Sequence, residues 1–399
     1  MGICRAVWNQ QVKVDDNGRV GLFGSHHKRQ VFVQMKRVLY IGGFELPDKN
    51  AAAQRVISIA KALRELGFCT QFYGITQSND KEGVVDGLQY EAYPHPKGTI
   101  AWFKYALGLG IIHYIKKKAP DYVFLYNYPA VAQERVISFC RRHGIMTVGD
   151  ITEWYRSTSF PKRIDTWYRM RFSNRHLDGI IAISRYLAEY YKGQRIVQLP
   201  PLVDKQEVKW QIKPIPRHDD RIHLVYIGTG SIKDRLDKII NGICKAGSER
   251  YQLDVIGINA DQFSTIYKQS LDLSSMNAVF HGRLPHQEAL NYLVNADFQV
   301  FFRDFIRVNN AGFPTKFVES MSAGIPVITN RISNIDDYVK NGVNSFMIEH
   351  PEDEEICEVL RIVSVLSREE IESIKNNCLR EEFDYRKYCG VIKEFMSSL

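Results

Sequence analysis

A lysine and a glutamate lie one turn apart in a short predicted helix near the end of the chain. The segment GFPTKFVESMSAGIPVITN (312–330) places Lys316 three residues before Glu319, so both side chains share one face. The free N–H groups of the first turn, the helix dipole and Lys316 can together hold an anion such as phosphate. Glu319 can accept hydrogen bonds from two vicinal hydroxyls, as on a ribose. The alternative is an ordinary helix with a local Lys–Glu ion pair.

The limits of this helix follow from three residues. Thr315 is a suitable N-cap, and Gly324 followed by Pro326 ends the helix. We therefore expect a loop, this helix and then a buried strand.

The elements that must position this helix repeat along the chain. Apolar, strand-like runs in the first half are 38–41, 69–75, 122–126, 145–149, 179–184 and 195–200. Those in the second half are 223–228, 251–257, 278–282, 298–302, 326–329 and 345–348. Helical patterns separate them, as in 51–67, which argues for parallel sheets covered on both faces. The predicted fold class is α/β, with two doubly wound, Rossmann-like domains that face each other across a cleft.

Changes in composition mark the predicted boundaries. Residues 1–34 are polar and weakly periodic and are expected to be an extension outside the fold, whereas 204–221 is rich in proline and charge and has the composition of a linker. The two domains then cover 35–203 and 222–380, followed by a terminal helix over 381–399.

Composition narrows the class of partner. The 399 residues are 45% apolar and carry a formal charge of +8, which favours an anionic partner such as a nucleotide, a nucleic acid or a membrane surface. Seven dispersed cysteines suit a reducing cytosol, and we find neither a secretory signal nor an apolar run of about 18 residues. No Asp-x-Asp, H-E-x-x-H, P-loop or G-x-S-x-G motif occurs, so we predict no bound metal.

Further candidates follow the ends of predicted strands. Gly43, in YIGGFELP, allows a close backbone approach to a ligand, although a tight turn explains it equally. Asp150 and Glu153 follow the strand over 145–149 and would face the cleft, with helix capping as the alternative for Asp150. Basic and aromatic residues mix in 99–118 and 154–176, which suits an anionic bilayer surface or inward-packed helices with solvated charges. No nucleic-acid-binding motif supports a nucleic-acid partner.

Several segments resemble one family in the same order. GFPTKFVESMSAGIPVITN is similar to the donor-site segment of GT-B fold nucleotide-sugar glycosyltransferases of the large retaining group, of the bacterial surface-polysaccharide type. The other matching segments are 38–68, 178–191 with 196–204, 223–243, 279–302 and 334–348. The resemblance covers about residues 36–399. It implies a first domain that holds the acceptor, a second that binds the donor, and a terminal helix that returns to the first domain.

The resemblance also implies roles for individual residues. The donor diphosphate would contact Phe313, Pro314, Thr315 and Lys316, and Glu319 would bond the ribose. Gly43 would lie beside the donor phosphate, Lys233 and Arg235 in GTGSIKDR would reach the diphosphate, and Arg283 would lie near the base; solvated loop charges are the alternative for these three. Asp150, then Glu153, would contact the acceptor, and Lys316 would stabilise the leaving group.

The sequence departs from the family at two positions. Ala311 stands where an acidic residue contacts the transferred sugar, with Asn309, Asn310 or Asp304 as substitutes, and Thr229 replaces an arginine of the diphosphate clamp.

The resulting prediction is a cytoplasmic, metal-independent glycosyltransferase without a cofactor. It would move a sugar from a nucleoside-diphosphate sugar to a saccharide or lipid-linked saccharide, in peripheral contact with the inner face of the cell membrane. A nucleotide-sugar epimerase, and a degenerate member that only binds glycan or a partner protein, are the alternatives.

Overall fold

The chain forms two compact units. A computed structural model describes residues 35–47, 50–78, 81–217, 219–268 and 277–399. Unit 1 contains the described residues up to Leu202 together with Tyr385–Leu399, and unit 2 contains Val203–Asp384. The extension predicted over 1–34 lies outside the described residues.

Unit 1 is built on an eight-stranded sheet in the order β3-β4-β2-β1-β5-β6-β7-β8. The strands are β1 (Lys36–Gly42), β2 (Phe68–Thr76), β3 (Glu82–Val85), β4 (Leu88–Pro94), β5 (Tyr122–Tyr126), β6 (Met146–Ile151), β7 (Gly179–Ala182) and β8 (Ile196–Gln198). All neighbouring strands are parallel except β3 and β4. The six strands predicted for the first half of the chain are all present.

The hairpin of β3 and β4 is absent from the prediction. Its two-residue turn has positive φ at both Asp86 (49°) and Gly87 (78°). Asp-Gly is a favoured pair for such a turn, so this dipeptide is the local signal for the hairpin. Because the two strands are polar and partly exposed, a search for apolar runs misses them.

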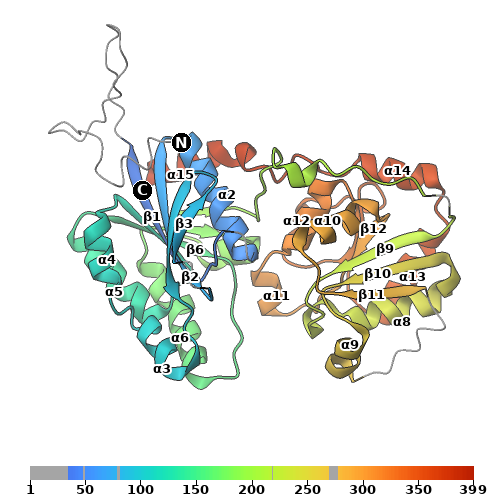
Figure 1. The fold of residues 1–399 in the computed structure, drawn as a ribbon, viewed down its shortest axis with the longest axis horizontal. Coiled ribbons are helices and arrows are strands. Elements are labelled where there is room, and N and C mark those ends of the chain that lie inside the picture. The colour runs from blue at the N-terminus through green and yellow to red at the C-terminus, as the bar shows by residue number, and fades with distance from the viewer. Residues whose placement is uncertain (1–34, 48–49, 79–80, 218, 269–276) are drawn as a thin grey trace, which may run out of the picture. The chain divides into compact units, whose positions relative to one another are not determined.

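Different helices cover the two faces of this sheet (Figure 1). Successive strand residues point to opposite faces. Val38 and Tyr40 pack with α2 (Ala51–Glu65) and α15 (Cys389–Ser398), whereas Leu39 and Ile41 pack with α4 (Ile111–Lys118) and α5 (Ala130–Arg142). The other helices of unit 1 are α3 (Gly98–Ala106), α6 (Phe160–Arg171) and α7 (Arg185–Tyr190), with short 3-10 turns at Ser173–His176 and Tyr385–Tyr388.

Unit 2 contains a six-stranded parallel sheet in the order β11-β10-β9-β12-β13-β14. The strands are β9 (Ile222–Ile227), β10 (Tyr251–Ile256), β11 (Ala278–Gly282), β12 (Phe298–Val300), β13 (Val327–Asn330) and β14 (Phe346–Ile348). All six were expected from apolar runs. The α/β class with two doubly wound parallel sheets is confirmed.

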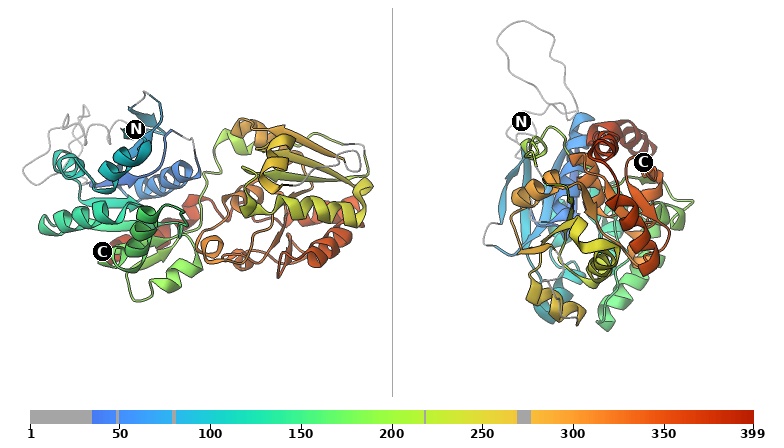
Figure 2. Two further views of the ribbon diagram at one scale, coloured as in Figure 1. Left: turned by 90° about the horizontal axis from the view of Figure 1, so that it is seen from below. Right: turned by 90° about the vertical axis from the view of Figure 1, so that its right-hand side faces the viewer.

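The helices of unit 2 also divide between two faces. Tyr226 and Val255 share a core with α8 and α13, and Val225 shares another with α10. Figure 2 shows α8 lying along the sheet. The helices are α8 (Leu236–Gly247), α9 (Ala260–Tyr267), α10 (His286–Asn295), α11 (Arg307–Ala311), α12 (Thr315–Ala323), α13 (Asp353–Ser364) and α14 (Arg368–Asn376), and the 3-10 helices are η2 (Val208–Trp210), η3 (Ile232–Asp234), η4 (Ser248–Arg250) and η6 (Ile335–Asp337).

Candidate functional site

The strand order of unit 2 reverses between β9 and β12. From β9 the chain continues to β10 and β11 on one side, then returns to place β12 and β13 on the other. Open parallel sheets bind ligands beyond the carboxyl ends of their strands at such a reversal. Gly228 and η3 follow β9, and Arg303, Asp304 and α11 follow β12. These segments and the first turn of α12 make up the candidate donor site.

The N-cap of α12 lies one residue earlier in the sequence than predicted. Pro314 is the N-cap and Thr315 is the first helical residue, so the expected capping by the Thr315 side chain does not occur. The predicted end is confirmed, because Gly324 adopts φ 79° at the C-cap. Proline has no N–H, and the N–H groups of Thr315 and Lys316 have no acceptor among the described residues. They are the donors that the first turn offers to an anion.

Lys316 points into the unit and not toward Glu319. Its Nζ lies 2.7 Å from Oδ2 of Asp234 and 4.7 Å from the centre of the Tyr226 ring, and the side chain is 10% exposed. A Cβ at Gly228 would come within 2.9 Å of this Nζ, so the glycine leaves room for the ammonium group. Burial lowers the pKa of Lys316, and the charge of Asp234 opposes that shift.

Asp234 joins two cations at the reversal point. Its Oδ1 accepts from Nε of Arg303 at 2.8 Å, while its Oδ2 accepts from Lys316. Burial alone would raise the pKa of the Asp234 carboxyl, but the two neighbouring cations outweigh burial and hold the pKa below its usual range. The buried trio therefore has a formal charge of +1, close to the free N–H groups of α12.

The cations of GTGSIKDR differ in their surroundings. Arg235 adopts φ 47° and pairs with Asp237 (3.1 Å) and Asp304 (2.8 Å), so both of its acidic partners would compete with a diphosphate. Lys233 is half-buried in η3. The structure thus brings Lys316 into the site core and places Arg235 in a separate, more exposed ion-pair network.

Glu319 and Arg283 form no hydrogen bond or ion pair with that trio in the described part of the chain, although the charge of Glu319 acts on Lys316. Glu319 is half-buried, and its Oε1 lies 3.0 Å from Nε2 of His286 on α10. Arg283 is exposed in the loop after β11. His286, Asp234 and Arg303 were missed from the sequence as site residues. A signal existed only for Asp234, which stands inside the motif GTGSIKDR.

The residues around Ala311 are mostly buried. Phe313, Asn309, Asn310 and Ala311 are at most 8% exposed, and the side-chain nitrogen of Asn309 donates to the Asp304 carbonyl. The side chain of Asp304 is 43% exposed. Of the three substitutes named for the missing acidic residue, Asp304 is thus the acidic and accessible one.

Asp150 lies inside unit 1, contrary to the expectation that it faces a ligand. The side chain is 0% exposed, its two carboxylate oxygens accept from Nε and Nη2 of Arg55 at 2.8–3.1 Å, and Tyr40 donates to Oδ2. Arg55 also donates to the carbonyl oxygens of Leu199 and Pro200. This network ties α2 to the sheet, so the carboxylate has a structural partner at each oxygen. Its placement corrects the predicted acceptor contact.

A cavity occupies the corresponding reversal point of unit 1, between β1 and β5. Its volume is about 370 Å³, and it reaches exposed Gly43 after β1 and Asn127 after β5. Glu153 is half-buried just beyond β6 but does not line it. The lining includes the aromatic residues Trp102, Tyr105 and Tyr155, the cations Arg156, Lys162 and Arg169, and the carboxylate of Asp165.

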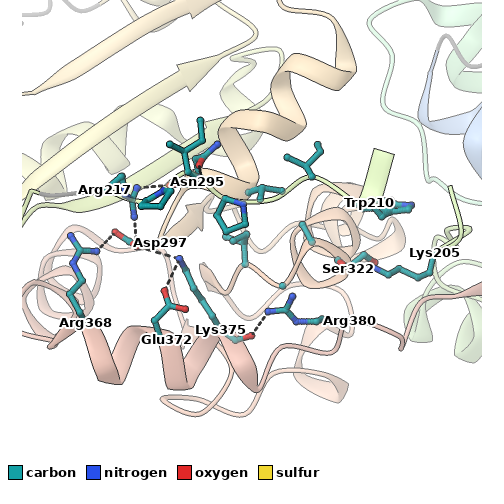
Figure 3. A pocket seen from close by; sticks show the side chains of 18 residues that line it. Lys205, Trp210, Arg217, Asn295, Asp297, Ser322, Arg368, Glu372, Lys375 and Arg380 are labelled. Atoms are coloured by element: carbon teal, nitrogen blue, oxygen red, sulfur yellow. Dashed lines mark hydrogen bonds and ion pairs between the residues drawn. The ribbon is translucent and has the colours of Figure 1, made fainter. Parts of the chain in front are cut away.

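A second cavity, of about 390 Å³, lies at the amino ends of strands in unit 2. Figure 3 shows Arg217, Arg368 and Lys375 around Asp297, which directly precedes β12 and is 1% exposed. Burial would raise the pKa of Asp297, but hydrogen bonding from the His223 N–H and the three cations hold the pKa below its usual range. The cluster ties the segment after Val203 to α14, at the opposite end of the sheet from the first turn of α12.

Comparison with known proteins assigns the family. Residues 204–377 match the model of the family "Glycosyl transferases group 1". The match covers unit 2, which is therefore a group 1 glycosyltransferase domain. The family match and the solved structures support a nucleotide-sugar glycosyltransferase. No curated protein matches the sequence.

Solved structures confirm the GT-B fold of this glycosyltransferase. Sucrose-phosphate synthase from Thermosynechococcus elongatus is 12% identical with a TM-score of 0.70, over 91% of this chain and 98% of that one. HepE from Anabaena, in complex with UDP and glucose, is 14% identical with a TM-score of 0.68, over 91% and 100%. The lipopolysaccharide outer core galactosyltransferase WaaB is 17% identical with a TM-score of 0.63, over 91% and 99%.

Among the described residues, no helix is both long and apolar enough to cross a bilayer. The same residues contain no group of three or more His, Cys, Asp or Glu side chains placed to hold a metal ion.

Proposed function

We propose that this glycosyltransferase binds the diphosphate of its donor at the first turn of α12 and transfers the sugar to a saccharide or lipid-linked saccharide held by unit 1, in the synthesis of a surface polysaccharide. One observation carries the donor site. Lys316 and Arg303 converge on Asp234 at the strand reversal, next to the free N–H groups of Thr315 and Lys316.

The chemistry follows from charge. The leaving diphosphate gains negative charge as its bond to the sugar breaks, and fixed N–H dipoles and buried cations stabilise that charge without reorganisation. In this proposal Lys233 and Arg235 add cations from the neighbouring loop, and Glu319, which contacts His286, would accept from ribose hydroxyls. We propose that this charge replaces a metal ion.

The comparisons suggest which donors to try first. HepE was solved with UDP and glucose, and WaaB is a galactosyltransferase of the lipopolysaccharide outer core. UDP-hexoses are therefore the first donors to test, followed by GDP- and ADP-sugars.

Diphosphate release from each nucleotide sugar, with and without oligosaccharide or lipid-linked acceptors, tests the proposal. We expect acceptor-dependent release that persists in EDTA. Loss of activity in EDTA with recovery in Mg²⁺ would contradict the metal-independent mechanism. Conversion of the donor sugar without any acceptor would indicate an epimerase.

The presence of Ala311 where the resembled family has an acidic residue favours a second candidate, a protein that binds nucleotides without turnover. Thermal stabilisation by UDP or GDP with no product from any donor would support that candidate.

An exposed surface on unit 1 supports contact with a membrane. Apolar side chains of α3, of α6 and of the residues that follow each helix are exposed. Lys162 of α6 lies 5.8 Å from the Trp102 ring of α3, so the two helices are neighbours. The exposed apolar residues are Ile100, Phe103, Leu107, Leu109, Phe160, Ile164, Trp167, Tyr168 and Phe172. Basic residues interleave with them, which suits anionic lipid. We expect co-sedimentation with vesicles containing phosphatidylglycerol, and binding to neutral vesicles alone would contradict the electrostatic part.

A further inference from the structure

Arg169 is a buried arginine in which two of the three guanidinium nitrogens have no hydrogen-bond acceptor among the described residues. It lies on α6, is 3% exposed, and donates from Nη1 to the carbonyl oxygen of Asn127. Its Nε and Nη2 atoms are buried and have no acceptor among the described residues. A charged group kept from water without its partners is costly, so this arrangement points to an acceptor that binds from outside the chain.

The unused atoms form one particular edge of the guanidinium group. Arg55 shows what that edge does when it is satisfied, since its Nε and Nη2 clasp both carboxylate oxygens of Asp150. Side-on pairing of this kind matches the two oxygens of a carboxylate or phosphate. In Arg169 the same edge has no such oxyanion among the described residues.

The acidic side chain that lines the same cavity as Arg169, that of Asp165, does not supply it. Asp165 lies one turn earlier on α6, but its Oδ1 accepts from the Ala130 N–H, and no ion pair joins it to Arg169 in the described part of the chain. Burial raises the pKa of Asp165, and the neighbouring Arg169 charge opposes that shift. Asp165 therefore moderates the positive charge of the site without filling it.

The surroundings of Arg169 form a site of suitable size and sign. Arg169 lines the 370 Å³ cavity at the strand reversal of unit 1, with its guanidinium 5.3 Å from the Tyr155 ring. Arg156 and Lys162 line the same cavity, so three cations face one carboxylate, Asp165. An excess of two positive charges favours a phosphate, which carries up to two negative charges, over a single carboxylate.

We propose that this cavity binds a phosphate group of the acceptor substrate, ester or diphosphate, through side-on bonds from Nε and Nη2 of Arg169, which a turn of the side chain toward the cavity would expose. The proposal rests on the proposed function, because it assigns the acceptor to unit 1. The phosphate could belong to a lipid diphosphate or to a soluble sugar phosphate. The aromatic walls of the cavity, Trp102, Tyr105 and Tyr155, would contact the sugar or lipid attached to it.

The test compares Arg169→Gln with the wild type and with Arg163→Gln. Arg163 lies on the same helix, is exposed and does not line the cavity, so it controls for lost charge. Binding of a short-chain polyisoprenyl diphosphate sugar, the corresponding free saccharide, a soluble sugar 1-phosphate and a uronate is measured by calorimetry, with UDP present to occupy unit 2. Where turnover is found, acceptor and donor KM are measured as well.

We expect Arg169→Gln to raise the dissociation constants of the phosphate-bearing ligands at least about tenfold. Binding of the free saccharide, UDP binding and the donor KM should not change. Arg169→Lys, which keeps the charge but not the fork, should recover only part of the affinity. Loss of the diphosphate lipid alone assigns the phosphate to a lipid-linked acceptor, and loss of both phosphate ligands assigns it to either source.

Two results would overturn the proposal. One is a folded Arg169→Gln protein that binds every phosphate ligand as the wild type does. The other is a uronate that binds more tightly than the phosphate esters. Since calorimetry needs no turnover, an inactive wild-type enzyme would count against the proposed function and leave the phosphate site testable by itself.

Discussion

Replacing Asp234 by asparagine should have opposite effects on stability and on nucleotide binding. This carboxylate compensates Lys316 at 2.7 Å and Arg303 at 2.8 Å. Breaking a buried ion pair from one side costs about 3–5 kcal/mol, because charge is left uncompensated. Unit 2 of Asp234→Asn should therefore unfold at a much lower denaturant concentration.

The affinity of the Asp234→Asn variant for the donor diphosphate should increase. At an effective dielectric constant of about 20 and a distance of about 7 Å, Asp234 repels each unit of diphosphate charge by ~2 kcal/mol. Removing that repulsion corresponds to roughly thirtyfold tighter binding for each unit of charge on the ligand. A diphosphate should thus restore much of the stability that Asp234→Asn loses.

Asp297→Asn is the matched control. Asp297 is also a buried carboxylate of unit 2 that compensates several cations (Figure 3). It precedes β12 and so lies at the opposite end of the sheet from Asp234. Thermal unfolding is recorded for both variants with and without pyrophosphate, UDP and GDP, and affinities are measured by calorimetry. We expect both variants to be destabilised. Only Asp234→Asn should gain more thermal stability from these ligands than the wild type does.

Equal ligand rescue of both variants would refute this reasoning, as would unchanged affinity in Asp234→Asn. Either result would mean that Lys316 and Arg303 do not face the diphosphate.

Three further predictions concern single groups. Lys316→Met should lower the turnover number about a hundredfold with little change in acceptor KM, as measured by diphosphate release; a loss below threefold would exclude Lys316 from transition-state stabilisation. Arg55→Met should destabilise unit 1 by about 3–5 kcal/mol in urea unfolding while calorimetry still detects nucleotide binding; retained stability would contradict the structural role of its pair with Asp150. The pKa of Asp297 is lowered in the folded state, so its stabilisation is present above the unfolded pKa near 3.8 and is lost as the pH falls through the lower folded pKa. The urea midpoint of the wild type should therefore fall more between pH 5 and pH 3 than that of Asp297→Asn; parallel falls would count against this assignment.

The sequence predicts those parts of the fold that depend on local apolar patterns. All twelve strands expected from apolar runs occur in the structure, and Gly324 ends α12 as its conformational freedom suggests. The polar hairpin β3–β4 is missed because its strands bury few apolar side chains. Its local sequence signal is the Asp-Gly turn.

The site is harder to predict, because its partners are distant in sequence. Spacing alone pairs Lys316 with Glu319, whereas the fold pairs Lys316 with Asp234, 82 residues earlier, and Asp150 with Arg55, 95 residues earlier. Neither contact leaves a periodic or local signal. The same limitation applies to Arg169, since its unused edge is defined by what surrounds it in three dimensions.

Residues 385–399 have a consequence for how this chain matures during translation. They belong to unit 1, and Ile392, Phe395 and Met396 sit in the core with α2, although all of unit 2 is synthesised between them and the rest of unit 1. Unit 2 is continuous in sequence and can therefore complete its folding before unit 1 does. Unit 1 cannot complete its core until α15 emerges, so part of its apolar surface stays exposed during translation. We therefore expect a nascent chain stopped before residue 385 to depend on chaperones.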